Sequence, residues 1–372
     1  MADYFGWDIG GVHLKLSRLT CVGESASIRT LIVPFEIWKD PAGLTRRLRE
    51  MFAEAAAEPC AGTDGRPDPA AFRSDRRRST GTHGVTMTAE LSDVFPSRAE
   101  GARSILRACA DALPVPPRVV DLRGGLLSLQ EALERPLDVA AANWAATARL
   151  TARLAQDAVL VDVGSTTTDI IPISGGQARP SGRTDTERLL TGELVYSGFL
   201  RTPPASLTES VPLRGGWCRV SNEHFTIMGD VHLILGSIGD RDYTCATPDG
   251  RGRSAEESMA RLARLVCGDV AEIGSHALET IAVYLKDRQV DHLARAIVQV
   301  RSCQPGAPSS RAIVAGAGAF LAEAASGRAG LEVTRLAGLL PALAGRDWDR
   351  SAPTAALAVL MAEEDGASRF TR

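Results

Sequence analysis

Two segments of this chain share one pattern: an apolar strand that ends in an aspartate, a tight turn of small residues, and a second strand. The first is DIGGVHLK at residues 8–15, and the second is DVGSTTTD at residues 162–169. Glycine-rich turns between two apolar runs indicate β-hairpins. Because the pattern recurs far along the chain, it predicts two related α/β lobes rather than one continuous sheet.

Hydrophobic periodicity and turn residues predict the other elements. Strands are expected at residues 4–9, 13–19, 28–35, 84–88, near 119, 158–163, 168–173 and 311–314. Helices are expected at residues 41–57, 98–113, 138–155, 224–235, 255–267, 277–301, from about 319, and 352–364. Asn222, Glu223 and His224 are expected to cap the helix that starts at Phe225, and residues 58–78 and 239–254 to be exposed loops.

The length of 372 residues suits two domains. We place the first lobe at residues 1–155, completed by the C-terminal helix 352–364, and the second at 156–351. The chain is 44% hydrophobic and 23% charged with a net charge of −3, which is typical of a soluble globular protein. Nucleic-acid or membrane partners are therefore not expected, and the protein should be cytoplasmic. The apolar helix at 352–361 is compatible with a homodimer.

The first turn has the residues of a phosphate-binding loop. Gly10 and Gly11 let backbone N–H groups approach an anion, and Lys15, one of three lysines in the chain, adds a positive charge. Asp8, at the end of the preceding strand, could position a magnesium ion through water. Read alone, the segment is equally well explained as a hairpin whose glycines serve only the turn.

Two further motifs strengthen the phosphate-binding interpretation. Ser165, Thr166 and Thr167 supply hydroxyl donors, and Asp162 and Asp169 bracket them. Gly164 precedes these hydroxyls, and later in the chain Gly316 and Gly318 follow a strand and precede a helix, where glycines can pack against a phosphate or base. The order of the three motifs is that of the actin, sugar kinase and Hsp70 superfamily, whose fold has two ribonuclease-H-like lobes with a central cleft.

Four strings carry a closer resemblance: residues 6–15 (GWDIGGVHLK), 86–91 (TMTAEL), 162–172 (DVGSTTTDIIP) and 201–203 (RTP). With them the chain resembles the hydantoinase/oxoprolinase-related proteins of the tetrahydromethanopterin-linked one-carbon pathway, over nearly its whole length. The resemblance implies a transferase of methanofuran or methylofuran biosynthesis. Such an enzyme joins (5-aminomethyl-furan-3-yl)methyl diphosphate to the phenol of a tyramine, tyrosine or γ-glutamyl derivative, forms an aryl ether and releases diphosphate.

This chemistry assigns expected roles. A furfuryl carbon ionises readily, so the main tasks are to stabilise the leaving diphosphate and to deprotonate the phenol. Lys15 and the two turns would bind the diphosphate, Asp8 and Asp162 would position a probable Mg²⁺, and no organic cofactor is expected. Candidates for the general base or other catalytic work and for substrate contacts are His13, Glu90, Asp169, Glu193 and Arg201.

Two other functions use similar motifs. One is an ATP-dependent small-molecule kinase or a hydantoinase-type hydrolase. The other is a nucleotide-sensing regulatory protein without chemistry. ATP turnover or tight nucleotide binding, each without ether formation, would distinguish them from the transferase.

Overall fold

In the computed structural model, which describes residues 1–23, 25–57, 80–304, 309–344, 348–367 and 370, the chain divides into two units. The first unit comprises residues 1–158, 173–187 and 335–372, and the second comprises residues 159–172 and 188–334. The expected loop at 58–78 lies outside the described residues.

The first unit is built on a mixed sheet with the strand order β15-β3-β2-β1-β4-β5-β6. Its strands are β1 (Ala2–Ile9), β2 (His13–Val22), β3 (Ser25–Pro34), β4 (Thr82–Met87), β5 (Arg118–Val120), β6 (Leu126–Leu127) and β15 (Leu343–Ala344). β1, β2 and β3 are antiparallel, whereas β4 runs parallel to β1, and β5 parallel to β4. The predicted N-terminal hairpin is confirmed.

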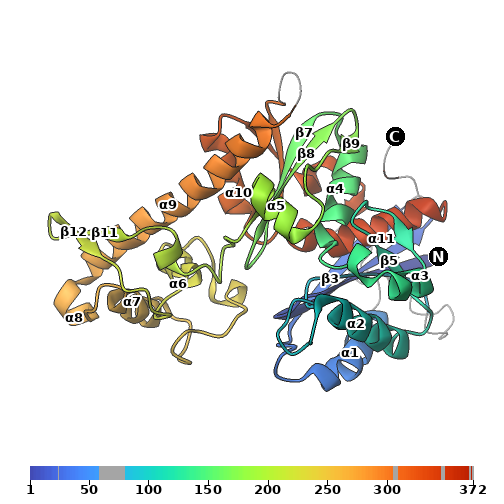
Figure 1. Ribbon diagram of the computed structural model, residues 1–372, viewed down its shortest axis with the longest axis horizontal. Coiled ribbons are helices and arrows are strands. Elements are labelled where there is room, and N and C mark those ends of the chain that lie inside the picture. The colour runs from blue at the N-terminus through green and yellow to red at the C-terminus, as the bar shows by residue number, and fades with distance from the viewer. Residues whose placement is uncertain (24, 58–79, 305–308, 345–347, 368–369, 371–372) are drawn as a thin grey trace. The chain divides into compact units, whose positions relative to one another are not determined.

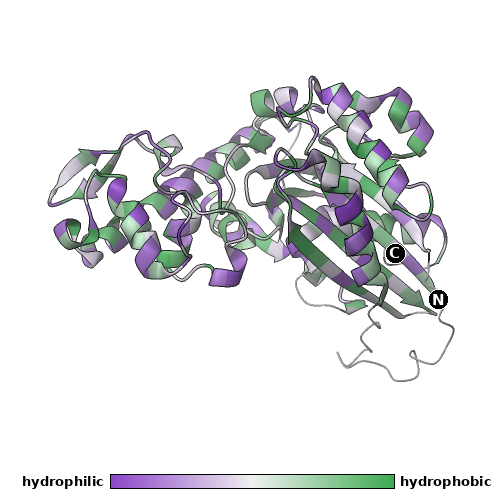
Figure 2. Cartoon of the chain, turned by 90° about the horizontal axis from the view of Figure 1, so that it is seen from below, coloured by the Kyte–Doolittle hydropathy of each residue, from purple (hydrophilic) through white to green (hydrophobic). Residues whose placement is uncertain are grey.

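Alternation along the strands gives the sheet two different faces. Trp7, Ile9, Leu14 and Val85 point to one side and form a core with α1 (Leu44–Ala57) and α2 (Arg98–Ala112), which lie together on that side (Figure 1). Figure 2 shows hydrophobic residues alternating with more polar ones along these strands.

The other face of the sheet is covered by α11 (Ala352–Glu364). Gly6 permits the close approach, since a Cβ there would lie 2.0 Å from the Thr354 carbonyl oxygen. α11 is buried from Ala352 to Ala362 because α4 (Asn143–Leu154) packs on it as well. Its apolar composition is thus used inside the unit and gives no argument for a homodimer.

A second sheet repeats the first. Its strands are β7 (Ala158–Val163), β8 (Thr168–Ser174), β9 (Gln177–Ala178), β10 (Leu194–Val195), β13 (Arg311–Ala315) and β14 (Glu332–Arg335). Most of this sheet lies in the second unit, whereas β9 belongs to the first. The order β10-β8-β7-β13-β14 matches β3-β2-β1-β4-β5 of the first sheet, with a hairpin followed by a strand parallel to its first member. The prediction of two related lobes is confirmed at the level of strand order.

Helices of the second unit form two cores. α9 (Ser275–Ser302) and α10 (Ala319–Arg328) pack against the sheet. The N-terminal half of α9 packs with α6 (Met228–Ile234), α7 (Ala255–Arg264) and the hairpin of β11 (Ser210–Leu213) and β12 (Gly216–Arg219), as Figure 1 shows.

The remaining elements of the two units are α3 (Leu129–Glu134), α5 (Asp185–Thr191), α8 (Val270–Ile273) and the 3₁₀ turns Pro41–Gly43, Pro136–Asp138, Pro204–Ser206, Asp240–Asp242, Leu336–Leu339 and Trp348–Ser351.

Three expectations need correction. The helix expected from Phe225 begins at Met228, because the Asp230 carboxylate accepts from the Ile227 N–H at 3.2 Å, so residues 222–224 do not cap it. The helix expected from residue 138 begins at Asn143, since Ala141 has a φ of 52° and cannot belong to a helix. Residues 192–216, for which no helix or strand is predicted above, contain β10 and part of the β11–β12 hairpin.

The division into units also differs from the expected lobes at two places. Residues 173–187 belong to the first unit, where the Gly176 N–H donates to the Gln156 carbonyl oxygen at 2.9 Å. Residues 335–351 join it because β15 pairs with β3. None of the helices formed by the described residues has the length and apolarity needed to cross a membrane.

Candidate functional site

Asp8 and Lys15 face each other on neighbouring strands of the first unit. They are Cα partners in the antiparallel β1–β2 pair, and Lys15 Nζ donates to Asp8 Oδ2 at 3.0 Å. The Asp8 side chain is 2% exposed and that of Lys15 is 27% exposed. A buried carboxylate needs a positive partner, so the hairpin fixes the ammonium group at a position where solvent or a ligand still reaches it.

The second oxygen of Asp8 has no partner in the described structure. Asp8 Oδ1 is buried and unbonded, and so is Oγ1 of Thr86, the Cα partner of Asp8 on β4. In-register partners on parallel strands point to the same face, so both atoms lie on the Lys15 side of the sheet. Buried polar atoms are nearly always hydrogen-bonded in native proteins, and a neighbouring pair without partners marks a place for water or a ligand.

The first glycine turn is shaped by its own hairpin. The Gly10 N–H donates to the His13 carbonyl oxygen at 3.0 Å, and a Cβ on Gly10 would lie 2.8 Å from that oxygen. A Cβ on Gly11 would meet nothing within 4 Å. Gly10 therefore serves the turn itself, whereas the Cα of Gly11 faces open space and its carbonyl oxygen accepts from the Ile37 N–H at 3.1 Å. His13 is buried and, two residues from Lys15 on β2, shares its face of the sheet.

Glu90 lies in the turn that follows β4. This turn is tied to the end of β1, because the N–H groups of Thr88 and Ala89 both donate to the Ile9 carbonyl oxygen. Glu90 is 1% exposed; its Oε1 accepts from Arg98 Nη2 at 3.1 Å, and its Oε2 is buried without a partner. Burial raises the pKa of Glu90, although the backbone and Arg98 oppose the rise. A carboxyl with these properties is suited to accept a proton.

In the second unit, the hydroxyl-rich turn is held by the segment that follows β10. The Gly164 N–H closes the turn by donating to the Thr167 carbonyl oxygen at 2.8 Å. The Arg201 N–H then donates to the Ser165 carbonyl oxygen at 2.9 Å, and a Cβ on Gly198 would lie 2.4 Å from the Thr166 nitrogen. Ser165, Thr166 and Thr167 are half-buried, and Arg201 is exposed beside them.

The later glycines pack against the same hairpin. Gly316 has a φ of +89°, and a Cβ there would lie 2.2 Å from the Val163 carbonyl oxygen and 2.4 Å from Asp162 Oδ1. The Gly318 N–H donates to the Val163 carbonyl oxygen at 2.9 Å. The strand-to-helix junction thus needs both glycines for close packing, whether or not a ligand binds there, and it lies directly beside Asp162.

Asp169 and Glu193 are joined by an arginine that the sequence did not single out. Arg188 is 1% exposed; its Nη2 donates to Asp169 Oδ1 at 2.7 Å and to the Glu193 carbonyl oxygen at 3.1 Å. The Glu193 carboxylate accepts from Thr191 Oγ1 at 2.8 Å. Asp169 is therefore the counter-ion of a buried guanidinium, which makes it a weaker candidate for the general base than Glu90.

Other polar residues have structural explanations. Asp230 is fully buried and its two oxygens accept from Arg261, Tyr243, Ser258, Thr226 and the Ile227 N–H. His83 is a core histidine: Trp7 Nε1 donates to its Nδ1 at 3.1 Å, and burial lowers its pKa to about 4. Among the described residues, no three or more His, Cys, Asp or Glu side chains gather as metal ligands.

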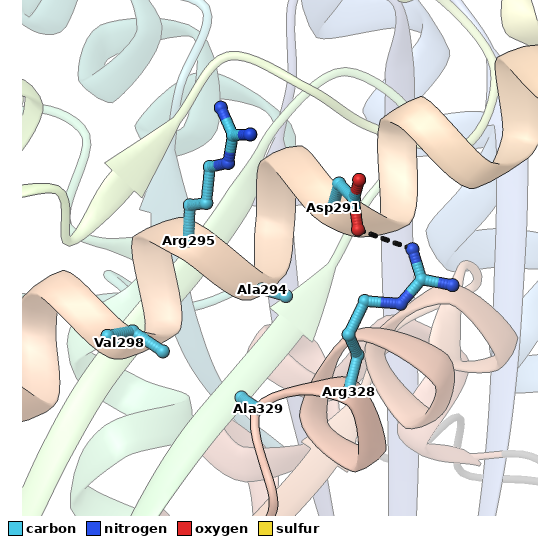
Figure 3. Close-up of a pocket in the computed structure, with 6 residues that line it drawn as sticks. All are labelled: Asp291, Ala294, Arg295, Val298, Arg328 and Ala329. Carbon is cyan, nitrogen blue, oxygen red and sulfur yellow. Dashed lines mark hydrogen bonds and ion pairs between the residues drawn. The ribbon is translucent and has the colours of Figure 1, made fainter.

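A cavity of about 320 Å³ lies between α9 and α10, away from all of these residues. Figure 3 shows the ion pair between Asp291 and Arg328 at its edge. Its lining consists of Asp291, Ala294, Arg295, Val298, Arg328 and Ala329. None of the predicted site residues lines this cavity.

The structural features that sequence reasoning missed are Thr86 as the neighbour of Asp8, and the two arginines Arg98 and Arg188. Thr86 stands in one of the four strings described above, and its strand position could have paired it with Asp8. No sequence pattern marks the two arginines, because each reaches its carboxylate only when the chain is folded.

A solved structure of another protein shares the fold of this chain. A solved structure of acetone carboxylase, nucleotide-free, aligns with a TM-score of 0.55 and 11% identity over 95% of this chain and 70% of that one. With the repeated strand order, this confirms the predicted actin/sugar kinase/Hsp70-like fold.

Two curated relatives bear the name (4-{4-[2-(γ-L-glutamylamino)ethyl]phenoxymethyl}furan-2-yl)methanamine synthase. The protein of Methanocaldococcus jannaschii is 43% identical over 186 residues, which are 50% of this chain and 56% of that protein. The protein of Methanococcus vannielii is 42% identical over 128 residues, which are 34% of this chain and 57% of that protein. The chain thus spans little more than half the length of each.

The family model described as hydantoinase/oxoprolinase matches residues 81–362, most of the chain. This range includes Glu90, the hydroxyl-rich turn and the Gly316–Gly318 junction. The chain belongs to the hydantoinase/oxoprolinase family.

Proposed function

We propose that the chain is a transferase of methanofuran or methylofuran biosynthesis that makes an aryl ether. The substrates are (5-aminomethyl-furan-3-yl)methyl diphosphate and the phenol of a tyramine, tyrosine or γ-glutamyl derivative, and the products are the ether and diphosphate. The two synthases at 42–43% identity support this proposal, because their name describes a phenol joined through oxygen to a furylmethyl group.

One observation in the chain itself carries the proposal furthest. The first unit holds both a partly exposed ammonium, Lys15, and a buried carboxyl with one bare oxygen, Glu90. An ether-forming transferase needs a cation for the leaving diphosphate and a base for the phenol.

In the proposed reaction, the bond between the furfuryl carbon and the diphosphate oxygen breaks, and its electron pair leaves with the diphosphate. The furan ring stabilises the resulting cation. The phenol oxygen forms the new bond to that carbon, and its proton passes to Glu90 Oε2. Lys15 and the backbone of Gly11 stabilise the leaving group, and the hydroxyl-rich turn of the second unit is proposed as a separate diphosphate-binding segment.

Magnesium fits as an auxiliary of the leaving group. Asp8 offers one buried oxygen without a partner, while Lys15 occupies the other. A single free carboxylate oxygen suits an ion held largely through water, which is how Mg²⁺ is often bound beside phosphates. Asp8, and Asp162 in the second unit, are the residues proposed to position it, and the ion would neutralise the diphosphate charge.

The test is incubation with the furan diphosphate and a panel of tyramine, tyrosine and their γ-glutamyl derivatives. Mass analysis should find an ether, with one diphosphate released for each ether formed. A parallel incubation replaces the furan donor by ATP with a sugar or a cyclic amide. ATP turnover there, without any ether in the first incubation, would overturn the transferase in favour of a kinase or hydrolase.

A further inference from the structure

The Glu90–Arg98 pair uses only one oxygen of its carboxylate, as the Asp8–Lys15 pair also does. Asp3, for comparison, accepts from Arg18 and Thr20 through both of its oxygens. Glu90 instead uses Oε1 alone for Arg98, and its buried Oε2 has no partner. A buried oxygen without a hydrogen-bond partner costs free energy. We therefore take this oxygen as a group that interacts with a ligand.

Arg98 contacts only one of these oxygens. It is the first residue of α2, whose N-cap Ser97 accepts from the Glu100 N–H. α2 approaches the Glu90 turn closely, since a Cβ on Gly101 would lie 2.5 Å from the Glu90 carbonyl oxygen. The fold therefore fixes the distance between the guanidinium and the carboxyl.

Burial has the largest effect on the pKa of Glu90 and raises it, and two charged groups also act on this carboxyl. Arg98, with its side chain 30% exposed, favours the carboxylate. Asp185, at the start of α5, lies 3.9 Å from Arg98 Nη2 and opposes the carboxylate as a like charge. Removing the guanidinium would leave a buried carboxyl with an acidic neighbour and no cation at hydrogen-bond distance, which favours the protonated form.

We propose that Arg98 is a positioning residue: by binding Oε1 it keeps Glu90 ionised and leaves Oε2 as the proton acceptor for the phenol. The inference rests on the proposed function, in which Glu90 takes the phenol proton. Nothing in the sequence marked Arg98 for this role.

The test measures Glu90 directly and then the reaction. Infrared difference spectra of the substrate-free protein, with Glu90→Gln to identify the band, give the pH midpoint of the Glu90 carboxyl. Arg98→Met should raise this midpoint by about one unit or more. The control is Arg103→Met on the same helix, where Arg103 pairs with the exposed Glu100, and it should leave the midpoint unchanged. Asp185→Asn should lower it.

The acid limb of kcat/KM against pH should move with the midpoint in each variant. Arg98→Lys keeps the charge, so it should restore the limb while kcat stays below that of the unaltered protein. An unchanged Glu90 midpoint in Arg98→Met overturns the inference, and so does a shifted midpoint with an unmoved acid limb. Absence of any ether from the unaltered protein is a separate failure, that of the proposed function, and the infrared result still decides whether Arg98 controls Glu90.

Discussion

Lys15 and Asp8 form an ion pair, so replacing Lys15 should change both the turnover and the stability of the fold. The two effects can be measured separately. Lys15→Met should lower kcat by about 100-fold, as the loss of one preorganised charge donor does in other enzymes. It should also destabilise the fold, because the Asp8 carboxylate stays buried without its cation. Steady-state kinetics and denaturant unfolding measure the two effects.

A double variant and a control complete this test. Asp8→Asn together with Lys15→Met should recover part of the stability but none of the turnover. Lys39→Met is the matched control, since Lys39 is largely exposed beside Glu36. Unchanged kinetics in Lys15→Met would remove Lys15 from the proposed mechanism.

Two buried histidines, His83 and His232, should make the stability of the folded protein sensitive to acid. Burial lowers the pKa of His83 and of His232 to about 4 in the folded protein, against about 6.5 when unfolded. The unfolded chain therefore binds more protons between these values, and stability falls as the pH drops from about 6.5 to about 4. Each histidine should contribute on the order of 3 kcal/mol to the fall.

Unfolding by urea across this pH range checks the histidine prediction. His83→Gln can still accept from Trp7 and donate to the Thr80 carbonyl oxygen, and it should flatten the pH dependence. His276→Gln, at an exposed position, should leave the dependence as it is. An equally steep fall in His83→Gln would contradict the assignment.

At the scale of elements, α9 holds the hydroxyl-rich turn through one side chain. Gln289 Nε2 donates to Ser197 Oγ at 3.1 Å and to the Gly198 carbonyl oxygen at 2.8 Å, while its Oε1 faces His232 Nε2 at 2.9 Å. The segment it fixes then packs on the turn, through the contact of Gly198 with Thr166.

Gln289→Met should therefore cost about 1–3 kcal/mol of stability through unpaired buried groups. It should also raise the KM for the furan diphosphate several-fold, because the turn loses its support. Gln299→Met, at an exposed position of the same helix, is the control. A stability loss with an unaltered KM would mean that Gln289 supports the core alone.

The elements also show which predictions a sequence supports. Both hairpins were predictable because glycine turns and apolar alternation are local signals. The start of α6 was not, since it depends on Asp230, which lies beyond the expected N-cap residues 222–224 and whose carboxylate is fixed by the distant Arg261. Likewise, tertiary packing pairs Asp169 with Arg188 and Glu90 with Arg98. The sequence alone therefore does not rank the candidate bases.

At the scale of the whole molecule, the repeated topology puts an aspartate at the same place in each unit. Asp8 and Asp162 stand at or near the end of the first strand of their hairpins, before the turns. Each turn is proposed to bind diphosphate, so each can be tested by itself. Calorimetry with diphosphate and Mg²⁺ should show weaker binding in Lys15→Met and also in Thr166→Val, and Lys39→Met should bind as the unaltered chain does.

Asp8→Asn extends this test to the metal. In this variant, added Mg²⁺ should no longer strengthen diphosphate binding, although binding without Mg²⁺ should persist. A full Mg²⁺ effect in Asp8→Asn would remove Asp8 from the proposed ion site. Full diphosphate affinity in Thr166→Val would restrict the leaving-group site to the first unit.

The place of α11 has a consequence for how the chain is made. The helix that covers β1 comprises residues 352–364, so β1 at residues 2–9 is synthesised long before its cover. Until Thr354 can dock beside Gly6, one side of the N-terminal sheet has no cover, although all of its main strands have been synthesised. The second unit, which ends at residue 334, can therefore fold during synthesis before the first unit has received the helix that covers its sheet.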